Sequence, residues 1–412
     1  MHLRNDIGLE RMSKMHILVL GGDGYLGWPT AMYFSSRGHD VTVVDNYFRR
    51  NSCLELDMTM LYPVPSLVER ARLWYEKSGY EIKVVIGDLA DPVLSRSLFD
   101  GRLTHDWAVT KDNSGPPDTV IHYAEQPSAP YSLLNYHYAN KTLSNNLLVT
   151  NNLMFAIRDF SPDTHIIKLG TMGEYGTPNI DIPEGWIDIK HNGRKDRFLF
   201  PRQAGSIYHT TKIMDTDLLW FGVRTWGLRV TDLMQGPVYG LLSDEIKIDP
   251  GLRTLFNYDE IFGTIVNRFI VQAVVGHPLT IYGRGGQTRG YLNIKDTLQC
   301  VYLSAITPAE PGRLRIYNQM METFSVNEIA DLTRRVGEHL GLEVKIENVV
   351  NPRVEAEEHY YNPTYQGLRD LGVKPHYLTE EVMAEMFEIV LKEKQSIRED
   401  IIFKGYKWQS NG

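Results

Sequence analysis

The sequence predicts an α/β Rossmann-type fold, a doubly wound parallel sheet followed by a smaller mixed substrate-binding region toward the C-terminus. Three neighbouring features predict it: an apolar, strand-like run at 15–20, a glycine-rich turn at 21–27, and a second apolar run that ends in Asp45. Strand, tight turn, helix and strand in this order open a dinucleotide-binding sheet, because the turn brings backbone N–H groups and a helix N-terminus to a pyrophosphate.

The glycine-rich turn and the acid after the second strand are the expected cofactor contacts. The glycines are spaced GxxGxxG rather than GxGxxG: Gly21, Gly24 and Gly27. A helical pattern follows at about 28–37, and Asp45 comes 18 residues after Gly27. A carboxylate there accepts hydrogen bonds from both adenosine ribose hydroxyls, which favours NAD over NADP. Arg49 and Arg50 keep NADP open as the alternative.

Strand-like and helical segments continue to alternate through the first part of the chain. Beyond Asp45, the apolar strand patterns lie at 83–86, 119–123 and 165–169. A helical pattern covers about 137–158, and the alternation predicts a parallel sheet with its ligand at the carboxyl ends of the strands. Residues 46–80 are long for one crossover, so we expect an insertion there, beside the cofactor site, with a helix near 66–77.

The alternation loosens after about residue 235, where short segments with glycine and proline recur. A helix is predicted at about 326–340, beginning at the N-cap residue Ser325. We therefore expect a mainly NAD-binding Rossmann domain over 15–235 and a mainly substrate-binding region over 236–412 that closes over the ligand edge. Residues 1–14 are expected to form a disordered extension.

The composition excludes several classes of protein. The 412 residues carry a net charge of −8, which argues against broad nucleic-acid or anionic-membrane binding. No apolar run is long enough to span a bilayer. Only two cysteines occur, Cys53 and Cys300, and no HExxH or similar set is present, so neither a disulfide framework nor a metal site is expected. These features favour a reducing, cytoplasmic location.

A helical tyrosine–lysine pair carries the expected chemistry. Tyr208 and Lys212 stand four residues apart and share one helix face. A nearby ammonium favours the phenolate, so Lys212 is expected to lower the pKa of Tyr208 and make it a general base. Thr171, at the end of a strand, can orient an alcohol against the tyrosine oxygen. With the glycine turn, the set predicts hydride transfer between an alcohol carbon and a nicotinamide; alone, the pair would indicate only an exposed helix face.

Other polar residues are candidates for substrate contacts. His209 points roughly 100 degrees away from Tyr208 around the helix, so it either reaches substrate as an acid or base or packs in the interior. Arginines suit bidentate binding of a diphosphate, and their alternative is a solvated surface charge. Four arginines stand among Gly, Gln, Asn and Tyr in the later segments: Arg268, Arg284, Arg289 and Arg353.

Longer motifs resemble one family. The chain contains GGDGYLGW, DNYFRR, GDLAD, TMGEYGTPNIDI, YHTTK, GHPLTIYGRGGQTRGYLNIKDT and NPRVEAEEHYYN. Over about residues 15–377 it resembles the UDP-sulfoquinovose synthases, which are extended short-chain dehydrogenases/reductases. GGDGYLGW and YHTTK point only to the superfamily, whereas TMGEYGTPNIDI, HNGR and NPRVEAEEHYYN are far more specific.

The resemblance implies a redox-neutral reaction of UDP-glucose and sulfite with tightly bound NAD. It implies oxidation at sugar C4, loss of water to a 4-keto-5,6-ene, addition of sulfite at C6 and re-reduction at C4. Related 4,6-dehydratases carry Asp-Glu directly after the threonine, where this chain has Met172 and Gly173. Glu174 or His209 is therefore expected to handle the C5 proton, and Met172 to form a neutral pocket wall.

Carried onto this chain, the resemblance and the motifs give the expected site. The catalytic residues are Thr171, Glu174, Tyr208, His209 and Lys212. The cofactor contacts are Gly21, Gly24, Tyr25, Leu26, Gly27, Asp45, Asn46, Arg49, Asp88, Leu89, Tyr123, Asn146, Gln235 and Val238, together with Tyr208 and Lys212. The substrate contacts are Thr171, Met172, Gln203, Ser206, Tyr239, Arg268, Gln287, Arg289 and Arg353.

One departure leaves the nucleophile open. The family reads Glu-Gln-Arg-Ser where this chain has Pro127 after Glu125 and Gln126, so a cation near the sugar is missing. Either another arginine supplies that charge, or the nucleophile is not sulfite. The alternatives are a 4-epimerase or a dehydratase with another acceptor, or a non-catalytic NAD-binding regulator. The superfamily resemblance also implies a homodimer built on a four-helix bundle.

Overall fold

Seven parallel strands form the central sheet of the computed structural model, which describes residues 13–102, 115–351 and 360–405. Their order across the sheet is β12-β8-β5-β4-β1-β2-β3, and every neighbouring pair is parallel. The strands are β1 (His16–Leu20), β2 (Asp40–Asp45), β3 (Lys83–Ile86), β4 (Thr119–His122), β5 (His165–Thr171), β8 (Arg229–Gln235) and β12 (Leu314–Gln319). The predicted doubly wound α/β fold is confirmed.

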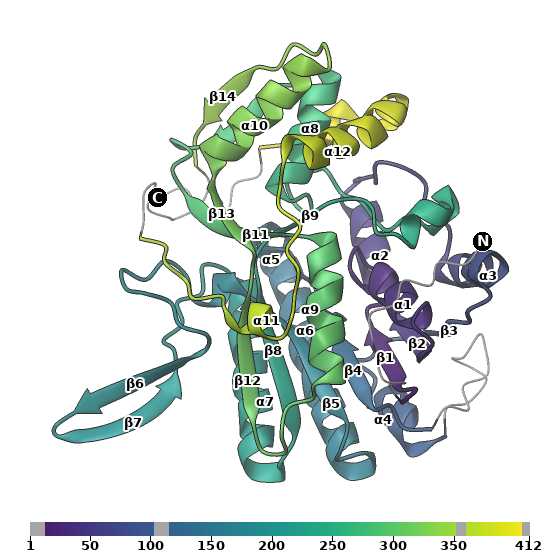
Figure 1. The fold of residues 1–412 in the computed structure, drawn as a ribbon, viewed down its shortest axis with the longest axis vertical. Helices are drawn as coiled ribbons and strands as arrows, with labels where there is room; N and C mark the ends of the chain where they lie inside the picture. Colours follow the sequence, from purple (N-terminus) through teal and green to yellow (C-terminus); the bar gives the residue numbers. More distant parts are fainter. Residues whose placement is uncertain (1–12, 103–114, 352–359, 406–412) are drawn as a thin grey trace.

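Helices cover both faces of this sheet (Figure 1). Alternate strand residues enter different cores, so Ile17 and Val19 pack on one face and Leu18 and Leu20 on the other. The first face is covered by α1 (Gly27–Ser35), α3 (Leu67–Ser78) and α9 (Ile294–Ile306). The second is covered by α4 (Pro92–Asp100), α6 (Tyr136–Phe160) and α7 (Ile207–Trp226). Such runs, buried on both sides, are typical of parallel sheets.

A second lobe lies beyond the carboxyl ends of the strands, in the upper part of Figure 1. Its helices are α8 (Ile265–Val275), α10 (Val326–His339) and α12 (Glu380–Lys392). It also holds the pair β10 (Leu279–Tyr282) and β14 (Ile346–Val349), and the sheet of β9 (Val238–Tyr239), β11 (Thr288–Asn293) and β13 (Glu322–Ser325). Its core extends to α5 (Ala129–Leu133) and to residues just after α2 (Phe48–Glu55). This lobe closes one side of the cavity described below.

Two helix starts follow their sequence signals. The segment 46–80 contains α2 and α3, and α3 begins after a capping box in which Ser66 and Glu69 satisfy each other's backbone N–H groups. The helix α10 begins after a capping box of the same kind, formed by Ser325 and Glu328.

The domain limits given above stay predictions. The elements α9 and β12 lie in the later part of the chain but return to the large sheet. The expected extension lies almost wholly outside the described residues.

A hairpin that the sequence did not predict extends away from the body (Figure 1). It consists of β6 (Trp186–His191) and β7 (Arg194–Leu199), paired antiparallel, with Asn192 and Gly193 in the turn at positive φ. Most of its side chains are exposed on both faces. A signal was present and was missed, because an Asn-Gly turn follows the alternating residues 187–190. The remaining short helices are α11 (Gly367–Asp370) and the 3₁₀ helices Met172–Glu174, Ile246–Ile248, Pro250–Leu252, Lys394–Ser396 and Glu399–Ile401. Among the described helices, none is long and apolar enough to cross a bilayer.

Candidate active site

A cavity of about 900 Å³ lies where the carboxyl ends of the central strands meet the second lobe. This is the edge at which doubly wound sheets bind ligands, because the loops after the parallel strands converge there. The cavity runs from the glycine turn and Asp45 at one end, past Thr171 and Tyr208, to Gln287 and Arg289 of the second lobe.

The glycine turn forms a cradle that side chains would fill. Gly21 adopts a φ of +84°, and a Cβ there would lie 2.8 Å from the carbonyl oxygen of Tyr123. A Cβ at Gly27 would lie 2.0 Å from the Gly21 carbonyl oxygen, so only glycine allows α1 to start against the turn. Together with the adjacent helix N-terminus, this cradle fits a dinucleotide pyrophosphate.

Asp45 closes the cradle at the expected ribose position. Its carboxylate accepts hydrogen bonds from the backbone N–H groups of Asp23 (2.9 Å) and Tyr47 (2.7 Å). Burial, helped by the neighbouring Asp23, raises the pKa of Asp45 to about 6. Arg50 makes a two-point ion pair with Asp23, at 2.7 and 2.8 Å, and also donates to the carbonyls of 64 and 65. Because Arg50 is already engaged, a 2′-phosphate would have to compete with Asp23 for it.

Most of the other expected cofactor residues reach the cavity. Those that line it are Gly24, Tyr25, Leu26, Asn46, Arg49, Asp88, Leu89, Tyr123, Gln235 and Val238. Asn146 lies behind the wall instead: its amide oxygen accepts from the backbone of Gln126 (2.8 Å) and its amide nitrogen donates to Thr211 (2.9 Å). Asn146 therefore ties α6 to α7 and to the loop after β4.

Tyr208, Thr171 and His209 meet at the middle of the cavity. Ser206 caps α7 by accepting from the backbone N–H of His209 (3.1 Å), and its hydroxyl also lies 3.1 Å from Nδ1 of the His209 ring. The Thr171 side chain lies close enough to the Tyr208 hydroxyl to act against the rise of its pKa. The end of β5 and the first turn of α7 thus hold a phenol, a hydroxyl and an imidazole around one point.

The His209 ring occupies the space that a side chain at 173 would take. A Cβ built on Gly173 would lie 2.3 Å from Nε2 of His209. The imidazole therefore stands where the second residue of a dehydratase Asp-Glu pair would begin. Met172, 5% exposed, forms an apolar wall beside it, as expected.

The predicted effect of Lys212 on Tyr208 is not found in this structure. Burial raises the pKa of Tyr208, and Glu125 and Glu174 raise it further; of the main groups that act on it, Lys168 and Thr171 are those that lower it. The Lys212 ammonium instead pairs with Glu125, with Nζ 2.7 Å from Oε2. A neutralised ion pair has little net charge to offer a neighbouring phenol, which explains the difference.

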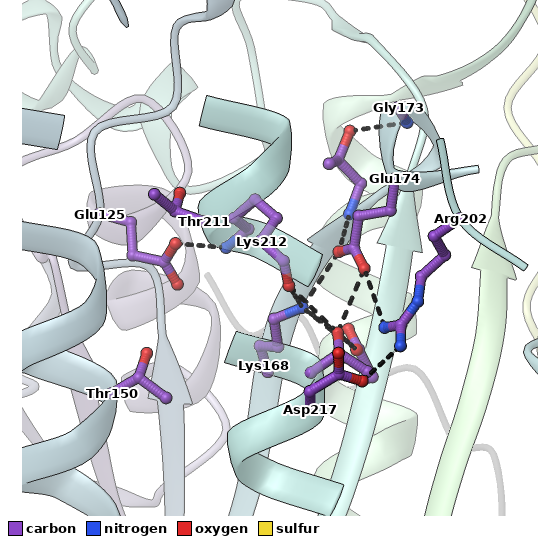
Figure 2. A network of polar contacts seen from close by, with 12 residues as sticks. Glu125, Thr150, Lys168, Gly173, Glu174, Arg202, Thr211, Lys212 and Asp217 are labelled. Atoms are coloured by element: carbon purple, nitrogen blue, oxygen red, sulfur yellow. Dashed lines mark hydrogen bonds and ion pairs between the residues drawn. The ribbon is translucent and has the colours of Figure 1, made fainter. Parts of the chain in front are cut away.

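Glu174 is not among the residues that line the cavity, and Figure 2 shows its carboxylate in a network of polar contacts with Lys168 and Arg202. Its side chain is fully buried, accepting from Lys168 Nζ (3.1 Å) and from the hydroxyl of Thr216 (3.2 Å). Its Oε1 also accepts from the backbone N–H of Thr171 (3.3 Å), which fixes the end of β5. Burial raises the pKa of Glu174, although the Lys168 ammonium acts in the opposite direction. Of the two candidates for the C5 proton, only His209 faces the cavity.

The expected substrate residues divide into two groups. Met172, Gln203, Arg268, Gln287 and Arg289 line the cavity with Thr171. Ser206 and Tyr239 do not: Ser206 caps α7, and the buried Tyr239 hydroxyl donates to Glu322 (2.6 Å). Arg284 is not among the lining residues either. Arg353 lies outside the described residues.

Arg49 lies near the catalytic centre. It lines the cavity, its guanidinium stacks 4.2 Å from the ring centre of Phe262, and Nη1 donates to the side-chain oxygen of Asn257 (3.3 Å). Burial lowers the pKa of Arg49, and Tyr208 is among the groups close enough to act against that effect. Across the described part of the chain, no carboxylate lies within 4 Å of this guanidinium.

Sequence reasoning missed the charged residues beneath the site. Lys168 contacts Glu174 at 3.1 Å and Asp232 at 3.2 Å, and all three are fully buried. A signal was present, because a lysine in the middle of the apolar strand β5 requires a buried partner. Within the described ranges, no group of three or more His, Cys, Asp or Glu residues could hold a metal ion.

Comparison with known proteins places this site among sugar-nucleotide enzymes. Residues 17–318 match the NAD dependent epimerase/dehydratase family. A chloroplastic UDP-sulfoquinovose synthase of Spinacia oleracea is 45% identical, covering 97% of this chain and 80% of the relative. A UDP-sulfoquinovose synthase of Sulfolobus acidocaldarius is 41% identical, covering 96% of this chain and 98% of the relative.

Solved structures share the fold at lower identity. A UDP-glucose 4-epimerase of Thermotoga maritima with UDP-glucose has a TM-score of 0.65 at 19% identity, covering 93% of this chain and all of that one. A UDP-glucose 4-epimerase of Thermus thermophilus with NAD has a TM-score of 0.61 at 20% identity, covering 91% of this chain and 99% of that one.

Proposed function

The chain belongs to the NAD dependent epimerase/dehydratase family and, within it, to the UDP-sulfoquinovose synthases, and from this membership we propose that it converts UDP-glucose and sulfite into UDP-sulfoquinovose and water. It is an enzyme, and NAD is its cofactor. The observation that carries the proposal is the His209 imidazole, which stands over Gly173 beside Tyr208 and Thr171. It gives the site an acid–base group for elimination where the dehydratase pair is missing.

Tyr208 and Thr171 carry out the proton transfers at O4 in this proposal. Thr171 orients the 4-hydroxyl, and Tyr208 removes its proton at the start and returns it at the end. The glycine turn and Asp45 would hold NAD, which when bound would supply the acceptor for the C4 hydride and the donor for its return. No net oxidation results, because the same carbon loses and regains the hydride.

His209 acts at C5 and C6. The 4-keto group acidifies the C5 proton, which Nε2 takes as a base. The same proton leaves with the 6-hydroxyl as water, and a C5–C6 double bond forms. Sulfite then adds through sulfur at C6, and the imidazole delivers to C5 the proton that bisulfite brings. The ring has one nitrogen facing the cavity and the other near the Ser206 hydroxyl, which suits a group that alternates between acid and base.

In this proposal Arg49 supplies the cation that is missing at position 127, where the chain has proline. Both residues line the same cavity, and the Arg49 guanidinium is held by a ring and an amide oxygen, with no neutralising carboxylate within ion-pair distance in the described chain. A guanidinium fits the oxygens of a sulfite or sulfonate group. The diphosphate of UDP-glucose is assigned to Arg268 and Arg289 of the second lobe.

Two alternatives fit the site less well. A dehydratase that stops after elimination, or a 4-epimerase, would use Tyr208 and Thr171 but would leave a sulfite-binding cation without a purpose. A non-catalytic regulator would not need the phenol, hydroxyl and imidazole to converge. Analysis of the reaction products separates both alternatives from the proposal.

The test is incubation of the protein with UDP-glucose, with and without bisulfite, and mass spectrometry of the sugar nucleotides. A sulfonated product that requires bisulfite supports the proposal. Formation of UDP-galactose, or of a 4-keto product that is the same with and without bisulfite, would replace sulfoquinovose synthesis with the corresponding alternative.

We also propose a homodimer and a cytoplasmic location for this chain. Exposed apolar side chains lie on α6 and α7, which pack against each other: Leu148, Phe155, Met214 and Phe221. Two such pairs would bury these residues in a four-helix bundle. The buried cysteines, Cys53 and Cys300, are free, which fits a reducing compartment.

A further inference from the structure

Lys212 is held in a buried ion pair. Nζ of Lys212 lies 2.7 Å from Oε2 of Glu125, and the two side chains are 4% and 3% exposed. Figure 2 shows the Glu125 carboxylate, from the loop after β4, pointing at the lysine of α7. His122 adds a contact from β4, with Nε2 3.4 Å from Oε1 of Glu125.

Among the ionisable groups around Lys212, Glu125 is the one that pairs with its ammonium. Burial lowers the pKa of His122 to about 4, so this ring is neutral at pH 7. Burial and the Glu125 charge hold the pKa of Asp215 on α7 well above its usual range. Lys168 on β5 is matched by Glu174 and by Asp232 on β8, at 3.1 and 3.2 Å.

Glu125 is itself charged. Burial acts to raise the pKa of Glu125, yet the ammonium groups of Lys212 and Lys168 act in the opposite direction, and this pKa lies below its usual range. The carboxylate also lines the cavity floor near Tyr208 and raises the pKa of that phenol. A negative charge therefore stands beside the ammonium that is expected to acidify the tyrosine.

We propose that Glu125 is a positioning residue: its carboxylate holds the Lys212 ammonium in a closed ion pair and so sets the pH at which Tyr208 loses its proton. The proposal rests on the role assigned above to Tyr208. In the proposed cycle Tyr208 takes a proton first and returns it last. A phenol whose acidity is held in check by Glu125 can perform both steps, whereas an uncompensated ammonium would favour only the first.

The test places difluorotyrosine, whose phenol is more acidic than that of tyrosine, at position 208 and follows its ionisation by fluorine NMR. The label reports one phenol among the 23 tyrosines and does not depend on turnover. We expect Glu125→Gln to lower the midpoint by about one pH unit or more, because Lys212 keeps its charge and loses its partner. Glu125→Asp, which keeps the charge, should restore most of the original midpoint. An unchanged or higher midpoint in Glu125→Gln would overturn the proposal.

A double variant keeps the proposal testable should Glu125→Gln not fold. Glu125→Gln with Lys212→Met removes both buried charges, which proteins tolerate better than the loss of one. Because the pair presents little net charge to Tyr208, the midpoint should stay within a few tenths of a pH unit of the unsubstituted value. A rise of about one unit or more would mean that Lys212 acidifies Tyr208 in the resting enzyme, and would refute the proposal. The ionisation midpoint at position 208 is measured without turnover. It therefore does not depend on whether sulfite is the nucleophile.

Discussion

The residue that decides the chemistry is Tyr208, which meets Thr171 and His209 in the middle of the cavity. Tyr208→Phe should reduce the rate of nicotinamide reduction by UDP-glucose about 10²–10⁴-fold, the usual contribution of a positioned acid or base. The absorbance of the reduced nicotinamide in single turnover measures this rate. Tyr258→Phe, which changes a buried tyrosine outside the cavity, is the matched control and should leave the rate unchanged. An unchanged rate of nicotinamide reduction in Tyr208→Phe would show that the tyrosine takes no part in this step.

His209 is predicted to act one step later. His209→Asn should leave nicotinamide reduction in place and slow the exchange of the C5 hydrogen with deuterated solvent about 100-fold or more. NMR of the sugar nucleotide measures that exchange. Glu174→Gln provides the comparison, since Glu174 is buried beneath the cavity and should retain exchange. Exchange lost in Glu174→Gln and kept in His209→Asn would reverse the assignment.

Arg49 and Arg50 are neighbours with different predicted roles. Arg49→Met should raise the KM for sulfite about 10- to 150-fold, which corresponds to the loss of a charged hydrogen bond worth roughly 1.5–3 kcal/mol. NAD content and nicotinamide reduction should stay near their original values. Arg50→Met should do the opposite, because Arg50 holds Asp23 beside Asp45. Loss of bound NAD from Arg49→Met, with an unchanged KM for sulfite, would place Arg49 at the cofactor instead.

At the scale of elements, the start of α1 depends on a close approach of two glycines. Gly27→Ala would put a Cβ 2.0 Å from the Gly21 carbonyl oxygen, so the turn must open. We expect a loss of about 1–3 kcal/mol in unfolding free energy, typical of overpacking, together with a fall in bound NAD. Gly24→Ala, where the nearest atom would be 3.3 Å away, should cost less stability. Thermal unfolding of the two variants checks the order, and equal losses would contradict it.

The elements that the sequence predicts best are those with a strong local pattern. The apolar runs of β1 and β2, the helical pattern near 66–77 and the N-cap residue Ser325 predicted the right elements, because burial on both faces, helical periodicity and a helix cap each leave a pattern in neighbouring residues. The exposed hairpin of β6 and β7 has no buried face, and its local signal, the turn at Asn192 and Gly193, was missed.

The sequence predicted only part of the site. Motif spacing identified Tyr208 and Thr171, which meet because β5 and α7 are adjacent in the fold. Spacing could not indicate that Lys212 pairs with Glu125, 87 residues earlier, or that Glu174 points beneath the sheet edge. Such pairings depend on which loops the strand order brings together, and this order is a property of the whole sheet.

At the scale of the whole molecule, the proposed dimer is open to a direct test. Light scattering with size exclusion should give about twice the chain mass of 47.2 kDa. Phe155→Glu combined with Phe221→Glu should give a monomer, because both side chains are more than 40% exposed on the α6 and α7 faces and would be buried in the bundle. Tyr75→Glu, on the exposed face of α3, is the control and should stay dimeric. A monomeric parent protein would refute the dimer.

The central claim is that one site removes a hydride from C4 and returns it to the same carbon after sulfite has added at C6. Reaction of UDP-glucose deuterated at C4 with bisulfite in ordinary water tests this most directly. The account predicts a sulfonated product that keeps the deuterium at C4, because the hydride never leaves the cavity, while C5 takes its hydrogen from solvent through His209. A sulfonated product with ordinary hydrogen at C4 would contradict it. So would a product that retains the original C5 hydrogen when the same reaction is run in heavy water.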